Sequence, residues 1–479
     1  MRRDRDAGQF ATLISGIGGD LALSPLSEAF SCLNDDALID RAVWYGSCVA
    51  ATNPWAVTGH SLKAAISRMV LHSRIALCAT VLALGIAATS FAREVSLEQA
   101  VAIALENNPD LAAAAKELVV AQSELQRANY ISQFNPELRS DADYRNRSGR
   151  SNAQDWRISF SQQLEVFGQP VLRRQSAHLS YQRTSADVRN QVRLLTAAVR
   201  MTFYEALRAR RQTQLLGELE ALNQRLAEAA QTRFEAGEIS QIDFNLARVR
   251  YGESRRALID GRERYRMERS SLGRLLGHAA GPEPEPAAKQ QFAPAPVDVE
   301  RLFETARANR PDLKAAQLEI ARVKTEAKLN NKLALPNPTL GTFFGHEQNT
   351  ERFGGISAGL SIPLFNRRQA EATALAGRLA QAQEKLRATE LNIERDVRDA
   401  YQRYLAALAA LRVNQADVVA PARESFGLLE AAFKAGKLDL LSLSLAERQA
   451  FEARMGYVDA RFNFDAAKVG LGLAIGGSL

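Results

Sequence analysis

Apolar and polar residues alternate over one segment in the first half of the chain. Between residues 156 and 166, Trp156, Ile158 and Phe160 are separated by single polar residues. This period of two is typical of a β-strand with one apolar face. A polar, turn-rich stretch connects the segment to an extended one over 135–146, so the two are predicted to form a β-hairpin.

The second half of the chain carries a similar pair of segments, over 339–346 and 355–364. Ile356 and Leu360 lie on the apolar face of the latter. Pro363 has no N–H to donate and would end strand pairing near that point. We therefore predict a second β-hairpin.

A long helix is predicted after each hairpin. Over 171–234, apolar residues recur at spacings of three and four, as in Val188, Val192 and Leu195, and the same spacing returns from Ile393 onward. This pattern indicates a coiled-coil seam. A helix of about 64 residues is roughly 95 Å long, so only a partner of similar length can bury it.

Shorter helices are predicted on either side of this element, at 96–133 and 241–276 in the first half. Ser96 and Gln99 have the spacing of a capping box, which marks the start of the first one. Placed end to end, the two shorter helices match the long one in length. Each half is therefore predicted to be a helical rod tipped by a β-hairpin.

Four short motifs occur twice in the chain, in the same order and 198 to 202 residues apart. A period this long predicts two copies of one large unit and not a solenoid of short repeats. We place the copies at 93–280 and 298–479, joined by a proline-rich linker over 281–297. The motif pairs are Pro109-Asp110-Leu111 with Pro311-Asp312-Leu313, Asn135-Pro136 with Asn337-Pro338, Phe167-Gly168 with Phe365-Asn366, and Phe234-x-Ala-Gly237 with Phe433-x-Ala-Gly436.

Residues 69–92 have the anatomy of a secretory signal peptide, with a short basic start, an apolar core and small residues before the cleavage site. The apolar core of about 14 residues is too short to span a membrane as a helix. We predict cleavage after Ala92. Residues 1–68 show no sustained periodicity and are interpreted as a disordered upstream extension from a misplaced start codon. All three cysteines precede the cleavage point, which leaves the mature chain without a thiol.

Composition, charge and the missing catalytic motifs together narrow the function of the chain. Hydrophobic residues make up 46% of the chain and charged residues 24%, and the net charge of +7 is spread along the helices without a nucleic-acid-binding patch. His178, His278 and His346 stand far apart in the sequence, and no phosphate-binding or dinucleotide motif is present. We therefore expect no catalytic residue, no cofactor, no metal site and no nucleic-acid partner.

The predicted strands have roughly the 9–11 residues that cross a bilayer. Four strands alone would leave unpaired backbone groups at their edges in lipid, and a closed barrel needs about eight strands. If the strands span a membrane, the chain must oligomerise. The alternative is a pair of small soluble hairpins packed on helices.

The duplicated plan and the quoted motifs resemble the TolC-like outer-membrane efflux protein family over residues 93–479. Residues 361–369 and 166–169 are most similar to the cation-efflux branch, the CzcC-type subunits of cobalt–zinc–cadmium pumps. The resemblance implies a mainly α protein with a transmembrane β-barrel. It also implies a homotrimer with a 12-stranded barrel in outer-membrane lipid and a periplasmic α-helical barrel. The chain would be a passive conduit for heavy-metal cations, working with a periplasmic adaptor and an inner-membrane resistance-nodulation-division transporter.

The two Phe-x-Ala-Gly turns are the candidate periplasmic tip and aperture of this conduit. Glycine there can adopt the left-handed conformation that reverses the chain after a helix. Some family members carry acidic residues just past the second turn, where this sequence has Ser442 and Leu445. The candidate residues are Phe234, Gly237 and Asp243 in the first copy and Phe433, Gly436 and Asp439 in the second.

Two other functions are compatible with the same sequence patterns. A channel of the same architecture could serve multidrug efflux or type I protein secretion. A soluble periplasmic coiled-coil adaptor would share the long helices but would have no need of paired hairpins with apolar faces.

Overall fold

A computed structural model describes residues 94–145, 153–277, 284–287, 298–347, 351–434 and 440–477. All of them belong to one compact unit, Ser90–Leu479. The predicted upstream extension, the predicted signal peptide and its cleavage site at Ala92 lie outside the described residues.

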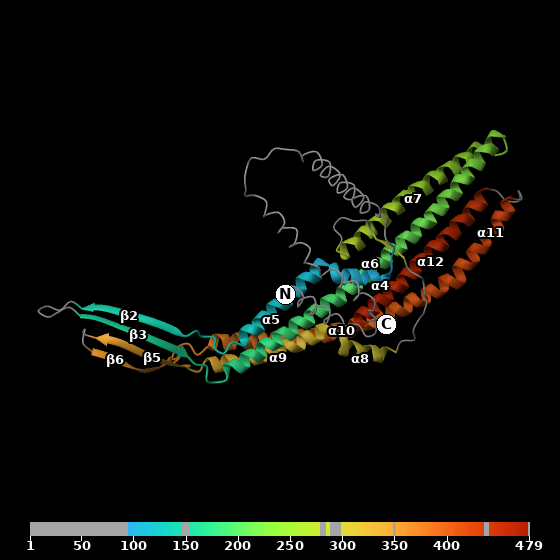
Figure 1. The fold of residues 1–479 in the computed structure, drawn as a ribbon. Helices are drawn as coiled ribbons and strands as arrows, with labels where there is room; N and C mark the ends of the chain where they lie inside the picture. The colour runs from blue at the N-terminus through green and yellow to red at the C-terminus, as the bar shows by residue number, and fades with distance from the viewer. Residues whose placement is uncertain are drawn as a thin grey trace, which may run out of the picture. The chain divides into compact units, whose positions relative to one another are not determined.

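The two hairpins join into one antiparallel sheet of four strands (Figure 1). The order is β2-β3-β5-β6, so the central contact is between the two halves of the chain, with Ile158 opposite Phe344. The bounds differ from those predicted by one to four residues: β2 is Glu137–Arg145, β3 Ala153–Gln163, β5 Pro338–Glu347 and β6 Glu351–Leu360.

The helices fill the rest of each repeat. A short parallel pair, β1 (Glu94–Val95) with β4 (Glu285–Pro286), ties the predicted linker back to the start of the first repeat. None of the described helices is both long and apolar enough to cross a membrane. The bounds are α4 Leu97–Asn107, α5 Pro109–Ala128, α6 Gln169–Glu235 and α7 Gln241–Leu275 in the first repeat, and α8 Val299–Asn309, α9 Pro311–Leu333, α10 Gln369–Val413, α11 Ala420–Lys434 and α12 Leu440–Ile475 in the second.

The single helix predicted over 96–133 is wrong, because the chain leaves the helical conformation at Asn108. Pro109 disfavours the α region for the residue before it, and Asn108 has an extended backbone (φ −69°, ψ 123°). The Asn108 side chain then caps the next helix by accepting hydrogen bonds from the backbone N–H groups of Asp110 and Leu111. Arg310 and Pro311 break the second repeat in the same way.

Each break is held by the end of the last helix in its repeat. The Asn108 amide donates to the carbonyl of Leu275, 3.0 Å away. Gly277 follows with a φ of +80° and lies so close that an added Cβ would be 2.3 Å from the Asn107 carbonyl oxygen. Gly476 has the same φ beside Asn309 in the second repeat. The repeats therefore share one closing contact.

The long helices of the two repeats differ. α6 runs without interruption for 67 residues. Its counterpart is divided, because a π-helical turn, Asn414–Val419, separates α10 from α11. Pro421 lies just beyond that turn. Its ring would clash with the carbonyl four residues earlier and its N–H is missing, so a widened turn relieves the conflict.

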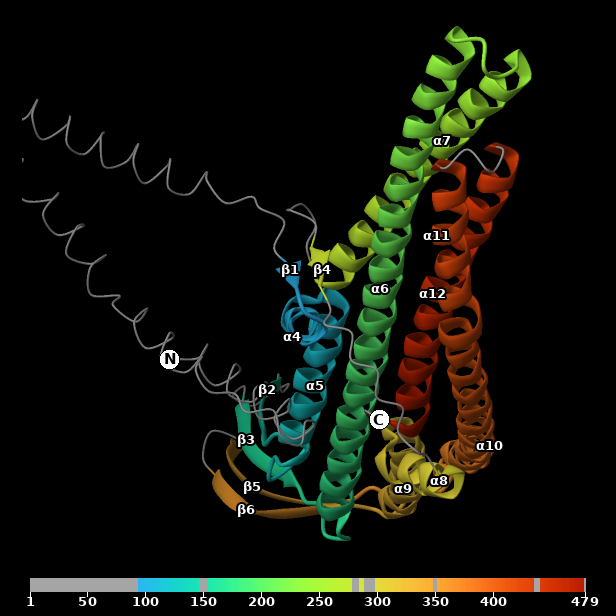
Figure 2. The same ribbon diagram turned by 90° about the vertical axis from the view of Figure 1, so that its right-hand side faces the viewer.

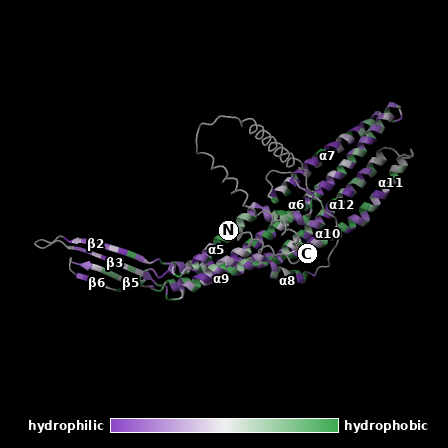
Figure 3. Cartoon of the chain, viewed as in Figure 1, coloured by the Kyte–Doolittle hydropathy of each residue, from purple (hydrophilic) through white to green (hydrophobic). Residues whose placement is uncertain are grey.

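α6 lies between elements of both repeats: α4, α5 and α7 from its own, α9 and α12 from the other (Figure 2). The predicted seam is buried in its first half, where Val199 and Phe203 pack with Leu272 and Leu276 of the α7 end. Towards Glu235 the helix pair is more polar (Figure 3). A second core forms where α8, α10 and α12 meet; it includes Leu302, Ile393, Val397, Tyr404, Phe464 and Leu471.

We predict that Gly277→Ala destabilises the protein by about 2 kcal/mol, because it combines a left-handed backbone with a clash against Asn107. The matched control is Gly252→Ala in α7, where an added Cβ meets nothing within 4 Å. That change should stabilise the helix by about 0.5–1 kcal/mol. Thermal unfolding of the purified variants followed by circular dichroism measures both. Equal midpoints for the two variants would contradict the prediction.

Candidate channel wall and helical tip

The four-stranded sheet has one face that is apolar and exposed. The register places Ile158, Phe344 and their neighbours across the strands on this face. Such side chains on the outside of a protein mark a surface that contacts lipid or another protein. The exposed large apolar residues of this face are Leu138, Tyr144, Trp156, Ile158, Phe160, Leu340, Phe344, Ile356 and Leu360.

The opposite face of the same sheet is charged, and its charge is mainly negative. Within the described strands it carries six carboxylates and three guanidinium groups. The carboxylates outnumber the cations by enough to give this face a net negative field. The acidic residues are Glu137, Asp141, Asp143, Asp155, Glu347 and Glu351, and the basic ones are Arg139, Arg145 and Arg157.

Arg145 connects three strands at the far end of this charged face. Its guanidinium lies 2.7 Å from the carboxylate of Asp155 on β3 and 3.1 Å from that of Glu347 on β5. Asp141 and Asp143 precede it on β2 and are exposed. The end of the sheet near the hairpin turns is thereby cross-linked, and part of its negative charge remains open to solvent.

Two phenylalanines lie flat on the charged face. Phe343 is opposite Gly355, and Phe353 is opposite Gly345. A Cβ on either glycine would lie less than 3 Å from the facing ring, so glycine is what allows the rings to fold onto the sheet. The guanidinium carbon of Arg157 stands 5.7 Å and 5.5 Å from the two ring centroids, within cation–π range.

The candidate tip of the first repeat is the turn between α6 and α7. Gly237 has a φ of +76°, and the N–H groups of Gly237 and Glu238 donate to the carbonyls of Phe234 and Arg233. This is a Schellman motif, as a helix-ending glycine forms. Asp243 forms a capping box with Ser240 at the start of α7. Asp243, a candidate aperture residue, therefore also caps the start of α7.

Phe234 stacks on Phe244 across the turn, with ring centroids 5.1 Å apart. This contact joins the end of α6 to the start of α7. In the second repeat, Gly436, Asp439 and the side chain of Phe433 lie outside the described residues, so their role at the aperture stays a prediction.

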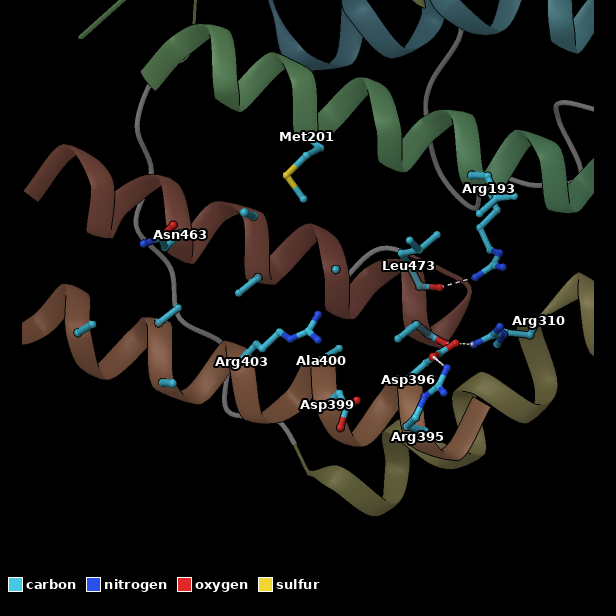
Figure 4. A pocket seen from close by; sticks show the side chains of 18 residues that line it. Arg193, Met201, Arg310, Arg395, Asp396, Asp399, Ala400, Arg403, Asn463 and Leu473 are labelled. Atoms are coloured by element: carbon cyan, nitrogen blue, oxygen red, sulfur yellow. Dashed lines mark hydrogen bonds and ion pairs between the residues drawn. The ribbon is translucent and has the colours of Figure 1, made fainter. Parts of the chain in front are cut away.

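A groove of about 1160 Å³ lies between α6, α10 and α12, beside the middle of α6 (Figure 4). Its lining combines seven alanines and one glycine with six charged residues, among them Arg193, Arg310, Arg403 and Asp399. The small side chains leave room between the helices, and Arg310 and Arg395 in the lining both pair with Asp396.

Arg310 is the most heavily bonded residue of this region, and the sequence reading passed over it. Its side chain is only 7% exposed. It donates to Asp312 at 2.6 Å, to Asp396 of α10 at 3.2 Å and to the carbonyl of Ala474 at 3.4 Å. The signal available in the sequence was its position before Pro311, where the first repeat has the capping residue Asn108.

The charges of this cluster determine the ionisation of Asp312. Burial alone would raise the pKa of Asp312, but its hydrogen bonds with Arg310 and the nearby charge of Arg193 lower the pKa below its usual range. Arg193 also donates to the carbonyl of Leu473, 2.5 Å away. The cluster thus joins α6, α9, α10 and the end of α12.

No group of three or more metal-ligating side chains occurs in the described part of the chain. Of the histidines noted in the sequence, His346 lies on the apolar face of the sheet and stacks beside Trp156, with ring centroids 6.5 Å apart. His178 lies on α6, far along the chain from it, and His278 is outside the described residues.

The sheet and the duplicated helices can now be compared with known proteins. The family model for the outer membrane efflux protein matches residues 100–278 and 302–477. The chain belongs to this family. Members are passive outer-membrane channels, so the chain is an outer-membrane efflux channel whose helical part lies in the periplasm, and it is not an enzyme. The alternative of a soluble adaptor is thereby set aside.

Two curated relatives cover most of the chain. The cobalt-zinc-cadmium resistance protein CzcC of Cupriavidus metallidurans is 26% identical over 375 residues, which are 76% of this chain and 85% of the relative. The pyoverdine export outer membrane protein OpmQ of Pseudomonas putida is 25% identical over 411 residues, 80% of this chain and 86% of the relative. The predicted similarity to the CzcC-type branch is confirmed.

Solved outer-membrane proteins share the fold. VceC from Vibrio cholerae is 17% identical with a TM-score of 0.66, over 80% of this chain and 96% of VceC. CusC is 18% identical with a TM-score of 0.66, over 80% of this chain and 92% of CusC. The predicted fold class, helices combined with a transmembrane β-barrel, is confirmed.

We predict that Arg310→Met destabilises the channel by about 3 kcal/mol, since Asp312 and Asp396 would lose their partner in a largely buried site. Arg307→Gln at the end of α8 is the control, because the Arg307–Glu394 pair is well exposed and should contribute less than about 1 kcal/mol. Denaturant unfolding of both variants tests this. A loss of the same size in both would show that burial of Arg310 adds nothing.

Proposed function

We propose that the chain forms a homotrimer whose three sheets close into one 12-stranded barrel, and that this barrel carries divalent heavy-metal cations out of the cell. The unpaired edges of the sheet support this closure. β2 and β6 are the outer strands, and each has a row of backbone groups that pairs with no other described strand. In lipid such groups cost several kcal/mol each, so the edges need partners.

A second copy of the chain supplies that partner in the right direction. The four strands alternate in direction, so β6 of one chain and β2 of the next would pair antiparallel. Repeating this contact around a threefold axis closes the sheet and removes every edge. The apolar face then contacts lipid, and the charged face lines the pore.

The negative charge of that lining is the observation that carries the cation proposal. Six carboxylates against three guanidinium groups in each chain would surround the pore with a field that attracts cations and repels anions. The exposed Asp141 and Asp143 contribute to this field, because Arg145 pairs with Asp155 and Glu347 and not with them. The similarity to a cobalt-zinc-cadmium resistance protein supports the same cargo.

We further propose the partners that the family uses, a periplasmic adaptor and an inner-membrane resistance-nodulation-division transporter. A passive channel does not itself drive its cargo. Selection and proton-driven transport would then lie in the transporter, and the channel would supply a pore of suitable charge.

The similarity to a pyoverdine export protein favours a second candidate, export of an organic molecule. The two candidates are separated by deleting the gene and measuring growth inhibition. Metal export predicts hypersensitivity to cobalt, zinc and cadmium, with unchanged tolerance of dyes and detergents, and rescue by the wild-type gene. Sensitivity to dyes and detergents alone would move the cargo to organic molecules while leaving the channel itself intact.

The charge of the lining makes a prediction of its own. The double variant Asp141→Asn and Asp143→Asn should lower the cation-to-anion permeability ratio roughly twofold or more, because it removes negative charge from the pore wall. The opposite control is Arg139→Gln on the same strand, which should raise the ratio. Reversal potentials across planar bilayers with a salt gradient measure both. A ratio that moves in neither variant would refute a lining role for this face.

A further inference from the structure

A buried glutamate lies where three helices from both repeats meet. Glu447 is on α12, Asn223 on α6 and Arg250 on α7, and they lie 7, 12 and 9 residues from the ends of these helices nearest the tip. Asn223, Arg250 and Ser444 also line one small void, which shows that the three helices pack together at this point. We call Glu447, Asn223 and Arg250 the three-helix junction.

Glu447 has an unusual environment for a carboxylate. The residue is 5% exposed, and neither of its carboxylate oxygens accepts a hydrogen bond of normal geometry. The Nε of Arg250 is buried without a hydrogen-bond partner as well. Burying an ionised carboxylate without hydrogen bonds is costly, whereas the neutral acid is tolerated and can donate its own proton.

The other charges that face Glu447 come from three elements. α6 offers Glu218 and Arg225, α11 offers Arg423, and α12 itself offers Arg454; these line a groove together with Glu447. Arg454 is 2.6 Å from Glu218 and is thereby partly neutralised. Burial raises the pKa of Glu447 to about 7, although Arg250 and Asn223 act to lower it. Glu447 therefore titrates near neutral pH.

We propose that Glu447 is a proton-sensitive latch that holds α12 against α6 and α7 when it is neutral and loosens this contact when it is ionised. The neutral acid fits the dry junction and has Asn223 beside it as an acceptor. The carboxylate requires water, and it obtains water only if the helices separate locally.

The direction of the effect follows from the two pKa values. In the open junction Glu447 is hydrated, and its pKa returns to the ordinary value of 4.5. In the closed junction the pKa of Glu447 is about 7. The closed state binds the proton more tightly, so its advantage is complete below pH 4.5 and is lost as the pH rises to about 7. Between these values the opening equilibrium constant should rise by up to about tenfold per pH unit, and above about 7 it should level off.

The consequence for transport rests on the proposed function. The α6–α7 turn and the start of α12 lie on the same side of the junction, towards the periplasmic tip. Loosening the junction would let the α6–α7 turn and the tip-side part of α12 move apart at the tip. The latch would then couple the protonation state of the periplasmic helices to the freedom of the tip to open.

Hydrogen–deuterium exchange of the full-length protein in detergent tests the latch without any cargo. Protection factors for α12 around Glu447 and for α6 around Asn223, corrected for the intrinsic effect of pH, are measured from pH 5 to 8. In the wild type we expect opening to increase from pH 5 to 7 and then level off. Glu447→Gln should stay closed and lose this dependence, since its amide cannot ionise.

Two further variants make the outcome decisive. Glu452→Gln on the same helix removes an exposed carboxylate paired with Arg448 and should keep the wild-type profile. Arg250→Gln removes the buried cation that lowers the pKa of Glu447. In this variant the opening of the junction should therefore level off at a pH above 7. The latch is refuted if the wild-type protection is the same at pH 5 and 7, or if Glu447→Gln keeps the pH dependence. Neither outcome would affect the growth assay, which tests the channel and its cargo.

Discussion

The burial of α6 is the constraint on which the rest of the structure depends. A helix of 67 residues exposes an apolar seam that no single neighbour in this chain is long enough to cover. Two shorter helices of its own repeat, α5 and α7, cover it from one side, and α9 and α12 of the other repeat cover it from the other. The two repeats therefore cannot fold as independent rods, and their hairpins are brought together into one sheet.

Pseudo-symmetry between the repeats is kept at the backbone, while the side chains that maintain it differ. Asn108 caps α5 and bonds to the end of α7, whereas Arg310 takes the same place and bonds to α9, α10 and the end of α12. Gly168 begins α6 in the left-handed conformation, and Arg368 does so before α10 with a φ of +59°, held by Asn330. Gln169 and Gln369 then begin the two long helices, 200 residues apart. The pairing of Phe167-Gly168 with Phe365-Asn366, which are 198 residues apart, is therefore displaced by two residues. The same break and the same turn can evidently be stabilised by an amide, a guanidinium or a glycine.

The fold separates lipid contact, conduction and regulation in space. The sheet has one apolar and one acidic face because side chains alternate along each strand. The helical part holds two buried polar sites, the Arg310 cluster beside the middle of α6 and Glu447 nearer the tip. A buried charge with several partners, as at Arg310, fixes helices in place, whereas a buried carboxylate without hydrogen bonds, as at Glu447, makes their contact depend on pH.

The sequence by itself determined the elements that local patterns encode. The strands follow from alternation at Trp156, Ile158 and Phe160, the long helices from spacings of three and four, and the turn at Gly237 from a glycine that ends a helix. It missed the break at Asn108, although Pro109 signalled it, because the apolar pattern continues across the break. The tertiary structure alone decided that β3 pairs with β5, which side chains share the acidic face, and that Arg310 and Glu447 are buried. These depend on contacts between segments far apart in the sequence, such as Ile158 with Phe344, and the periodicity of one segment carries no information about which distant segment will cover it.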